Sequence, residues 1–144
     1  MHPTVDEQLR EARRILEEVV EPEVQTDYPA DTLRAVLSAL QMLEGAWSEV
    51  LPFLHWDNEA TAALLDAALH HDVAGDLGAR IRVSLARPPA DATDVEAAHR
   101  RNLELRALLT EVVPWAFRWD TGAVDATIVD HLRERARRYP FSTA

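Results

Sequence analysis

The chain has 144 residues, of which 25 are acidic and 15 basic, giving a formal net charge of -10 at pH 7. This length is typical of a single domain, and the excess of negative charge disfavours nucleic acid as a partner. The absence of cysteine excludes disulfides, thiolate metal sites and cysteine nucleophiles, and no apolar run is long enough for a membrane span. We therefore expect a cytoplasmic protein with a single helical domain over residues 1–144.

Capping signals and apolar spacing predict the first two helices. Thr4 and Glu7 form a capping box, and the apolar residues behind them recur at helical spacing, which predicts a helix over residues 5–25. The proline-containing run TDYPAD follows it. Asp31 then caps a helix over residues 31–55, whose seam has the spacing of a helical bundle: Val36, Leu40, Leu43, Trp47, Val50 and Leu54.

Three more helices are predicted in the rest of the chain. An alanine- and leucine-rich segment predicts a helix over residues 58–86, capped by Asp57 or Asn58 and weakened midway by two glycines. Two consecutive prolines in LARPPADATD break the chain. A second capping box and two apolar seams predict helices over 94–118 and 121–138. The predicted fold class is all-α, a five-helix bundle.

Two stretches of the sequence nearly repeat each other, namely EVLPFLHWD (Glu49 to Asp57) and EVVPWAFRWD (Glu111 to Asp120). Proline removes a backbone amide and disfavours helical geometry in the residue before it, so each stretch predicts a helical hairpin corner. Two interpretations stay open. In the first, two corners with the same geometry have the same residue types without being related. In the second, two hairpins are duplicates related by a pseudo-twofold axis, with the N-terminal helix packed against them.

Histidine supplies the candidate metal ligands. Asp66 and His70 stand four residues apart on one helical face, which permits joint ligation, while His55 and His131 lie in or at the ends of other predicted helices. Helical bundles bind metals through side chains that several helices point inward. These four residues are therefore the candidate ligands of a metal-dependent bundle enzyme. The favoured alternative is a solvated helix end at His70, because a transition-metal site needs several convergent ligands and Asp66 and His70 are a single pair.

Other catalytic signatures are missing from the sequence. No serine lies in a G-x-S-x-G elbow, and four glycines are too few for a phosphate-binding loop. We expect no cofactor and favour a protein that is not an enzyme. Most aromatic side chains near the two predicted corners are expected in the core, but Phe53 and Trp115 directly follow the prolines. We expect these two to be exposed and to contact a partner.

The stretch LREARRILEEVVEPEV (Leu9 to Val24), followed by Tyr28 and an alanine- and leucine-rich helix, and the ending ARRYPFST together resemble an uncharacterised bacterial family of small helical proteins. Members of that family are encoded beside acyl-CoA dehydrogenases and aminoglycoside-phosphotransferase-like kinases. The resemblance implies an accessory role near acyl-CoA metabolism.

The sequence as a whole favours a non-catalytic helical accessory or protein-interaction protein, which binds a protein partner or forms a homo-oligomer. Two alternatives stay open. One is the metal-dependent enzyme with His and Asp ligands, and the other is a binder of small apolar ligands, with a pocket between helices. Neither nucleic acid nor a membrane is an expected partner.

Overall fold

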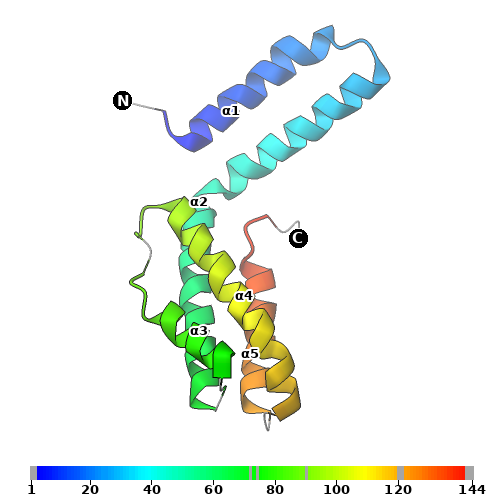
Figure 1. Ribbon diagram of the computed structural model, residues 1–144. Coiled ribbons are helices and arrows are strands. Elements are labelled where there is room, and N and C mark those ends of the chain that lie inside the picture. Colours follow the sequence, from blue (N-terminus) through cyan, green and yellow to red (C-terminus); the bar gives the residue numbers. More distant parts are fainter. Residues whose placement is uncertain (1–2, 72, 74, 90, 120–121, 142–144) are drawn as a thin grey trace. The chain divides into compact units, whose positions relative to one another are not determined.

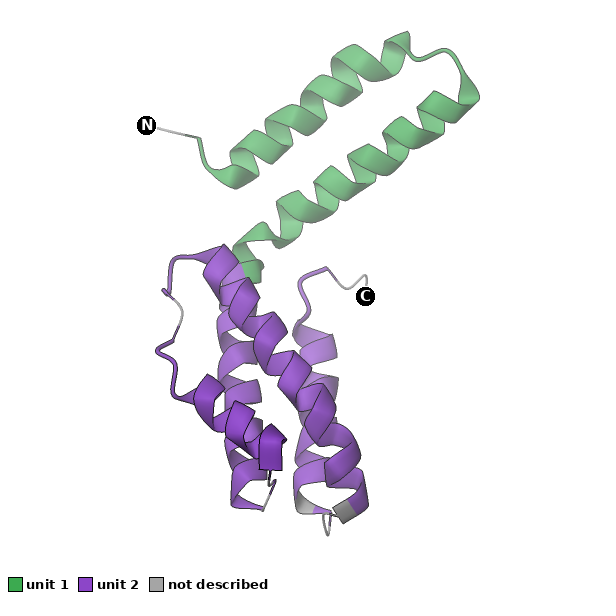
Figure 2. Cartoon of the chain, in the orientation of Figure 1, with its two compact units in different colours: residues 1–50, 143–144 green, residues 51–142 purple. Residues whose placement is uncertain are grey.

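The computed structural model describes residues 3–71, 73, 75–89, 91–119 and 122–141. Within these residues the chain contains five α-helices and no strand, so the all-α prediction is confirmed (Figure 1). The described residues fall into two compact units, the first ending at Val50 and the second beginning at Leu51 (Figure 2).

The first unit is a hairpin of two helical segments. Its first helix, α1 (Val5–Ile15), begins at the predicted capping box, in which Oγ1 of Thr4 accepts from the amide of Glu7 and the Glu7 carboxylate accepts from the amide of Thr4. The helix continues as a π-helical segment (Leu16–Val20) and a 3-10 turn (Glu21–Glu23). The chain then turns, and the first part of α2 (Asp27–His70) returns alongside α1 (Figure 1).

Helix α2 is continuous over 44 residues and passes through Pro52. The predicted break between residues 55 and 58 is therefore wrong, and Asp57 lies inside a helix instead of capping one. A proline inside a helix costs a backbone hydrogen bond and crowds the preceding turn. Phe53 and Leu54, which follow it, are buried, and their burial in the second unit offsets part of that cost.

The two copies of the repeat do not have the same geometry. The first lies in the interior of α2, whereas the second lies in the last turns of α4 (Val95–Trp119), with its proline inside that helix. Only the second copy is followed by the end of a helix. The interpretation as two duplicated hairpins is therefore not supported, because the first copy forms no corner.

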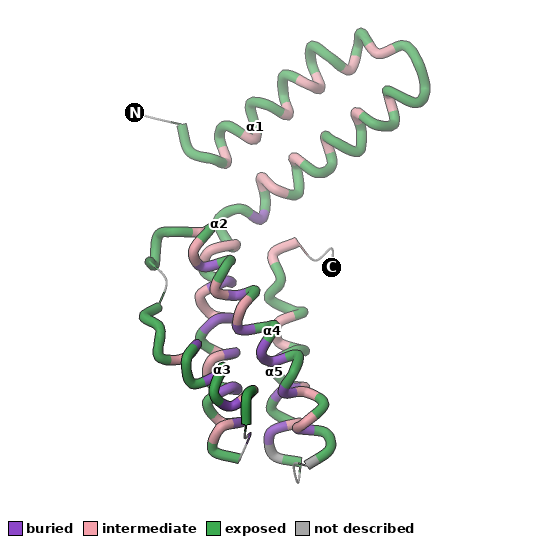
Figure 3. Tube along the Cα trace, in the orientation of Figure 1, coloured by how far each residue is buried: buried purple, intermediate pink, exposed green. Residues whose placement is uncertain are grey.

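The second unit holds the apolar core. It consists of the C-terminal part of α2, α3 (Gly75–Leu85), α4 and α5 (Ala123–Arg138). All four helices contribute to one buried cluster, and Figure 3 shows the buried residues concentrated in this unit. The cluster contains Leu64, Leu65, Ala68, Val73, Ile81, Leu105, Leu108, Leu109, Val112, Ala116, Val124 and Ile128.

Glycine separates α3 from α2, where the sequence predicted one helix over 58–86. Gly75 has a φ of +70°, a left-handed conformation that glycine adopts without the cost that a Cβ imposes. Gly78 is buried, and a Cβ at this position would overlap the carbonyl oxygen of Val73. The chain can fold back tightly here because neither position carries a side chain.

Candidate functional site

The four predicted metal ligands do not form one site. His70 bonds through Nδ1 to the backbone oxygen of Asp66, at the exposed end of α2. The ring of His55 is hydrogen-bonded to a carbonyl of the α3–α4 loop, and His131 is buried beside Asp57. Because α2 is continuous, His55 and His70 lie roughly 22 Å apart along one helix. No group of three or more potential ligands placed to hold a metal occurs among the described residues.

The two predicted interaction residues have different surroundings. Phe53 is only 7% exposed, and its ring packs against Trp56 and Tyr139, with centroid distances of 6.1 and 5.6 Å. Trp115 is half-buried against the apolar core. The expectation that Phe53 is exposed is wrong, because α2 continues through Pro52 and turns this ring toward the end of α5.

A buried carboxylate, Asp57, is the centre of a polar cluster that links three helices. Its Oδ2 accepts hydrogen bonds from Nδ2 of Asn102 in α4 (2.7 Å) and from Nε of Arg135 in α5 (2.9 Å). Nε2 of His131 lies 3.1 Å from Oδ1, in a direction poorly aligned for a hydrogen bond. The Asp57 side chain is fully buried, so its carboxylate is shielded from water.

The partners of Asp57 keep it ionised. Burial by itself raises the pKa of a carboxyl group, since the charged form loses its hydration. The contact with His131 and the hydrogen bonds from Asn102 and Arg135, together with the positive charge of Arg135, outweigh that effect and lower the pKa of Asp57 from 3.8 to about 2. The folded protein therefore holds a buried negative charge at neutral pH, paired with Arg135.

The cluster also contains Thr61, so it combines an acid, an imidazole and a hydroxyl. In a catalytic triad the two ring nitrogens have different partners, one the acid and the other the nucleophile. Here the same nitrogen, Nε2 of His131, lies 3.1 Å from Asp57 and 3.4 Å from Oγ1 of Thr61. The ring cannot pass a proton from the hydroxyl to the acid in this arrangement, and Thr61 is fully buried. The cluster is suited to holding helices together.

Aromatic rings and arginines extend the cluster toward the end of α5. The guanidinium group of Arg135 lies 5.4 Å from the ring centroid of Phe53, and that of Arg138 lies 4.5 Å from the ring of Trp56. The Trp56 ring also packs against His131, with a centroid distance of 5.5 Å. Cations over aromatic faces are attracted to them. These contacts fix the position of Arg135, the residue that neutralises Asp57.

The sequence contains a signal for this cluster in the form of polar residues at core spacing. Asn102 stands three residues before Leu105 on the apolar seam of α4, and His131 stands three residues after Ile128 in α5. All four are buried. A polar residue in register with a seam is expected to have a buried partner, because an unpaired polar group is costly inside a protein.

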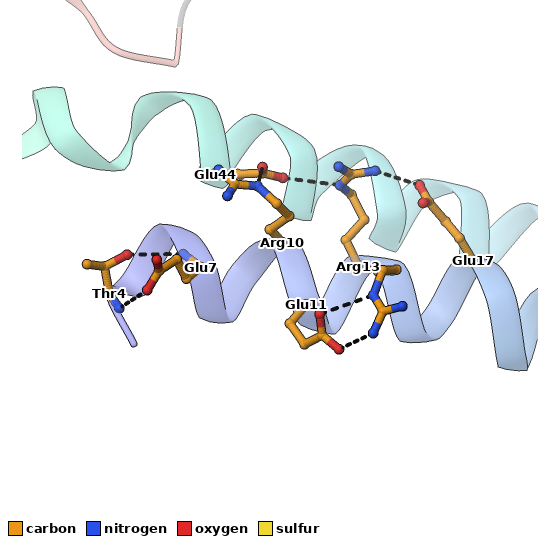
Figure 4. A network of polar contacts seen from close by, with 8 residues as sticks. Thr4, Glu7, Arg10, Glu11, Arg13, Glu17 and Glu44 are labelled. Carbon is orange, nitrogen blue, oxygen red and sulfur yellow. Dashed lines mark hydrogen bonds and ion pairs between the residues drawn. The ribbon is translucent and has the colours of Figure 1, made fainter. Parts of the chain in front are cut away.

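The first unit has almost no core. Ala46 is the one buried apolar residue among the described residues of this unit, and α1 has none (Figure 3). Ion pairs connect the two helices: Nε of Arg10 and Nε of Arg13 lie 2.8 and 3.2 Å from oxygens of Glu44 (Figure 4). Ion pairs near the surface contribute little stability. Several leucines of the two segments, among them Leu9, Leu16 and Leu40, are half-buried.

Exposed apolar side chains gather on one side of this hairpin. Half-buried residues such as Leu9 in α1 and Leu40 in α2 mark where each helix faces the other. Successive residues of an α-helix are rotated by 100° about its axis. Measured from Leu9 or from Leu40, a second set of apolar residues is rotated by roughly 20° to 120°, in the same sense in both helices. Because the helices are antiparallel, equal rotations point to the same side. We call this surface the hairpin face; it consists of the exposed residues Val5, Ala12, Ile15, Val19, Val36, Ala39 and Trp47 and the half-buried Leu43.

The hairpin carries most of the net negative charge of the chain. Residues 1–50 include eleven acidic residues and four arginines, a net charge of -7. Each of the four arginines is already paired with a carboxylate of the same hairpin, and Figure 4 shows several of these pairs. The hairpin therefore presents an apolar face on a strongly acidic element.

Comparisons of this chain with protein-family models, with curated proteins and with solved structures found no match. Of the helices in the described part of the chain, none combines the length and the apolar composition that crossing a membrane requires.

Proposed function

We propose that this protein is a non-catalytic interaction protein that binds a helix of a partner protein through the hairpin face. The observation that carries this proposal is an amphipathic two-helix hairpin that has almost no core and leaves an apolar face exposed. Helices in proteins owe most of their stability to the packing of an apolar face. A partner helix on the hairpin face supplies the packing that the hairpin lacks.

The partner is a basic amphipathic helix. A second copy of this chain would place a hairpin of net charge -7 against another of the same charge, which is unfavourable, whereas lysines and arginines beside an apolar stripe would be attracted. Trp47 lies on the hairpin face and is partly exposed. Tryptophan is a common anchor of protein interfaces, so we assign Trp47 that role.

We further propose a cytoplasmic setting, which the absence of cysteine supports. The resemblance to proteins encoded beside acyl-CoA dehydrogenases leads us to propose an enzyme of that neighbourhood as the partner, with this protein as its accessory. The buried, structural character of the Asp57 cluster supports a role that depends on contact instead of turnover.

Two synthetic helical peptides test the proposal. They share one leucine stripe, which is flanked by lysines in one peptide and by glutamates in the other. We expect the full-length protein to bind the lysine peptide, and the double variant Ile15→Gln, Val36→Gln to bind it about tenfold or more weakly, since each exposed apolar side chain contributes about 1 kcal/mol or more when covered. The measurement is fluorescence anisotropy of labelled peptide.

The substitutions leave the charge unchanged, so a loss of binding cannot come from weaker electrostatic attraction. Ser38→Gln, on the polar side of α2, is the matched control and should bind like the unmodified protein. Equal binding of both peptides, or no effect of the double variant, would contradict the proposal. Sedimentation that shows a dimer dissociated by the double variant would instead identify a second copy as the partner.

A further inference from the structure

Three adjacent hollows in the second unit meet at Arg87. The first, of about 450 Å³, lies between α3 and α4 and has an apolar floor that includes Val83 and Leu108. The second, of about 250 Å³, is lined by Arg87, Arg100 and Arg101 among others. The third, of about 180 Å³, reaches from Arg87 and Arg101 to α2. An apolar trough thus leads directly into a group of arginines.

The arginines here outnumber the carboxylates that pair with them. Glu104 accepts from Nη1 of Arg87 at 2.8 Å and from Nη1 of Arg101 at 3.3 Å, so two guanidinium groups share one carboxylate. Arg100 is exposed, and its side chain makes no ion pair or hydrogen bond with the described residues. The second hollow, which these three arginines and Glu104 line, therefore has a local excess of positive charge. The other carboxylates that line the hollows are Glu111 in the first and Glu59 in the third.

Arg101 is held in a fixed position. It donates from Nη1 to Oγ of Ser84 at 2.8 Å and from Nη2 to the Ser84 carbonyl at 2.9 Å, and its side chain is 14% exposed. A guanidinium group that is already ordered loses little conformational entropy when it binds an anion. Its Nε takes part in none of these bonds.

We propose that this region binds a soluble single-chain amphiphile with an anionic head, of the class of medium-chain carboxylates. The carboxylate lies among Arg87, Arg100 and Arg101, since guanidinium groups match the geometry of a carboxylate. The alkyl chain covers the floor of the first hollow, where Val83 is 61% exposed to water. A hollow of about 450 Å³ is in the size range of small-ligand pockets. The site shares no residue with the hairpin face.

Titration calorimetry of the full-length protein with decanoate tests this assignment. We expect saturable binding that Val83→Asp weakens about tenfold or more, because it places a negative charge under the alkyl chain, and that Arg100→Gln weakens about fivefold. Leu132→Asp on α5 and Arg106→Gln on α4 are the matched controls. Both residues are exposed and lie outside the three hollows, so these variants should bind decanoate like the unmodified protein.

Two further probes separate the proposed ligand from other causes of binding. Decyltrimethylammonium has the same chain with a cationic head, and binding as tight as that of decanoate would overturn the role of the arginines. Binding to phosphatidylglycerol vesicles without binding to monomeric decanoate would replace the soluble ligand by a lipid surface. If Val83→Asp does not fold, Val83→Gln takes its place. Unchanged decanoate affinity in a folded Val83 variant would overturn the proposal.

Discussion

At the scale of single residues, the role of Asp57 is set by its tertiary contacts and not by its neighbours in the sequence. In the sequence, Asp57 follows a tryptophan, and this position predicts a helix cap, which is a usual place for aspartate. The structure places it inside a helix, paired with Arg135 and Asn102. Spacing predicts which residues share a helical face, but it does not say which faces of distant helices meet. The residues of the cluster can therefore be found in the sequence, but the pairs that they form cannot.

Replacing Asp57 by asparagine is expected to destabilise the protein by on the order of 3 kcal/mol at neutral pH, because the partly buried Arg135 loses its fully buried counter-charge. Chemical denaturation followed by circular dichroism measures this. Asp130→Asn removes an exposed carboxylate that pairs with Arg133 on α5, and it should change the free energy of unfolding by less than about 0.5 kcal/mol.

The same comparison has a defined pH dependence. The pKa of Asp57 is lower in the folded protein, about 2, than its ordinary value of 3.8. The stability it contributes is therefore fully present above pH about 4 and is lost as the pH falls toward about 2. The difference between the unmodified protein and Asp57→Asn should shrink by on the order of 2 kcal/mol over that window. A difference that does not vary with pH would show that the pKa of Asp57 is not lowered in the folded protein.

At the scale of elements, local sequence predicted where helices form better than where they stop. The capping box at Thr4 and the seam of α4 lie where the sequence placed them. Pro52 misled the prediction, since a proline usually bends or ends a helix, and here the burial of Phe53 favours continuation. In α5 the buried face runs through His131 instead of Leu132, which is 46% exposed.

Gly78 provides a test of the α2–α3 connection. Alanine at this position is expected to destabilise the protein by about 1 to 3 kcal/mol, because its Cβ would overlap the carbonyl oxygen of Val73 and force the backbone to move. The control is Gly45→Ala in α2, where a Cβ meets no atom and should stabilise the helix by up to about 1 kcal/mol. Thermal unfolding of both variants gives the comparison. A stabilised Gly78→Ala variant would mean that the tight approach is absent.

At the scale of the whole molecule, the two units differ in what holds them together. Apart from Ala46, the buried apolar residues in the described part of the chain all lie in the second unit. The length of the chain predicted one domain. Both parts have the same helical periodicity, and periodicity does not reveal whether an apolar stripe is covered. The hairpin face was not recognised for this reason, although Trp47 and Val36 stood on the predicted seam.

This difference predicts how the parts behave when they are separated. A fragment of residues 48–142 is expected to unfold in a single cooperative transition, because it contains the complete buried cluster. A peptide of residues 1–50 is expected to be partly helical and to melt gradually, since it has almost no core. Circular dichroism during heating distinguishes the two behaviours. A gradual transition of the larger fragment would show that its core depends on the hairpin.

The π-helical segment Leu16–Val20 marks the place where the hairpin tolerates a change in length. The amide of Glu21 bonds to the carbonyl of Leu16, five residues back, so this turn contains one residue more than a turn of α-helix. Such a turn is equivalent to a single inserted residue. A deletion within it would restore ordinary α-helical bonding and leave both flanks intact, whereas a deletion inside α1 would rotate Val5 about 100° away from Ile15. During evolution, one-residue insertions and deletions in this hairpin are thus expected to collect between Leu16 and Val20.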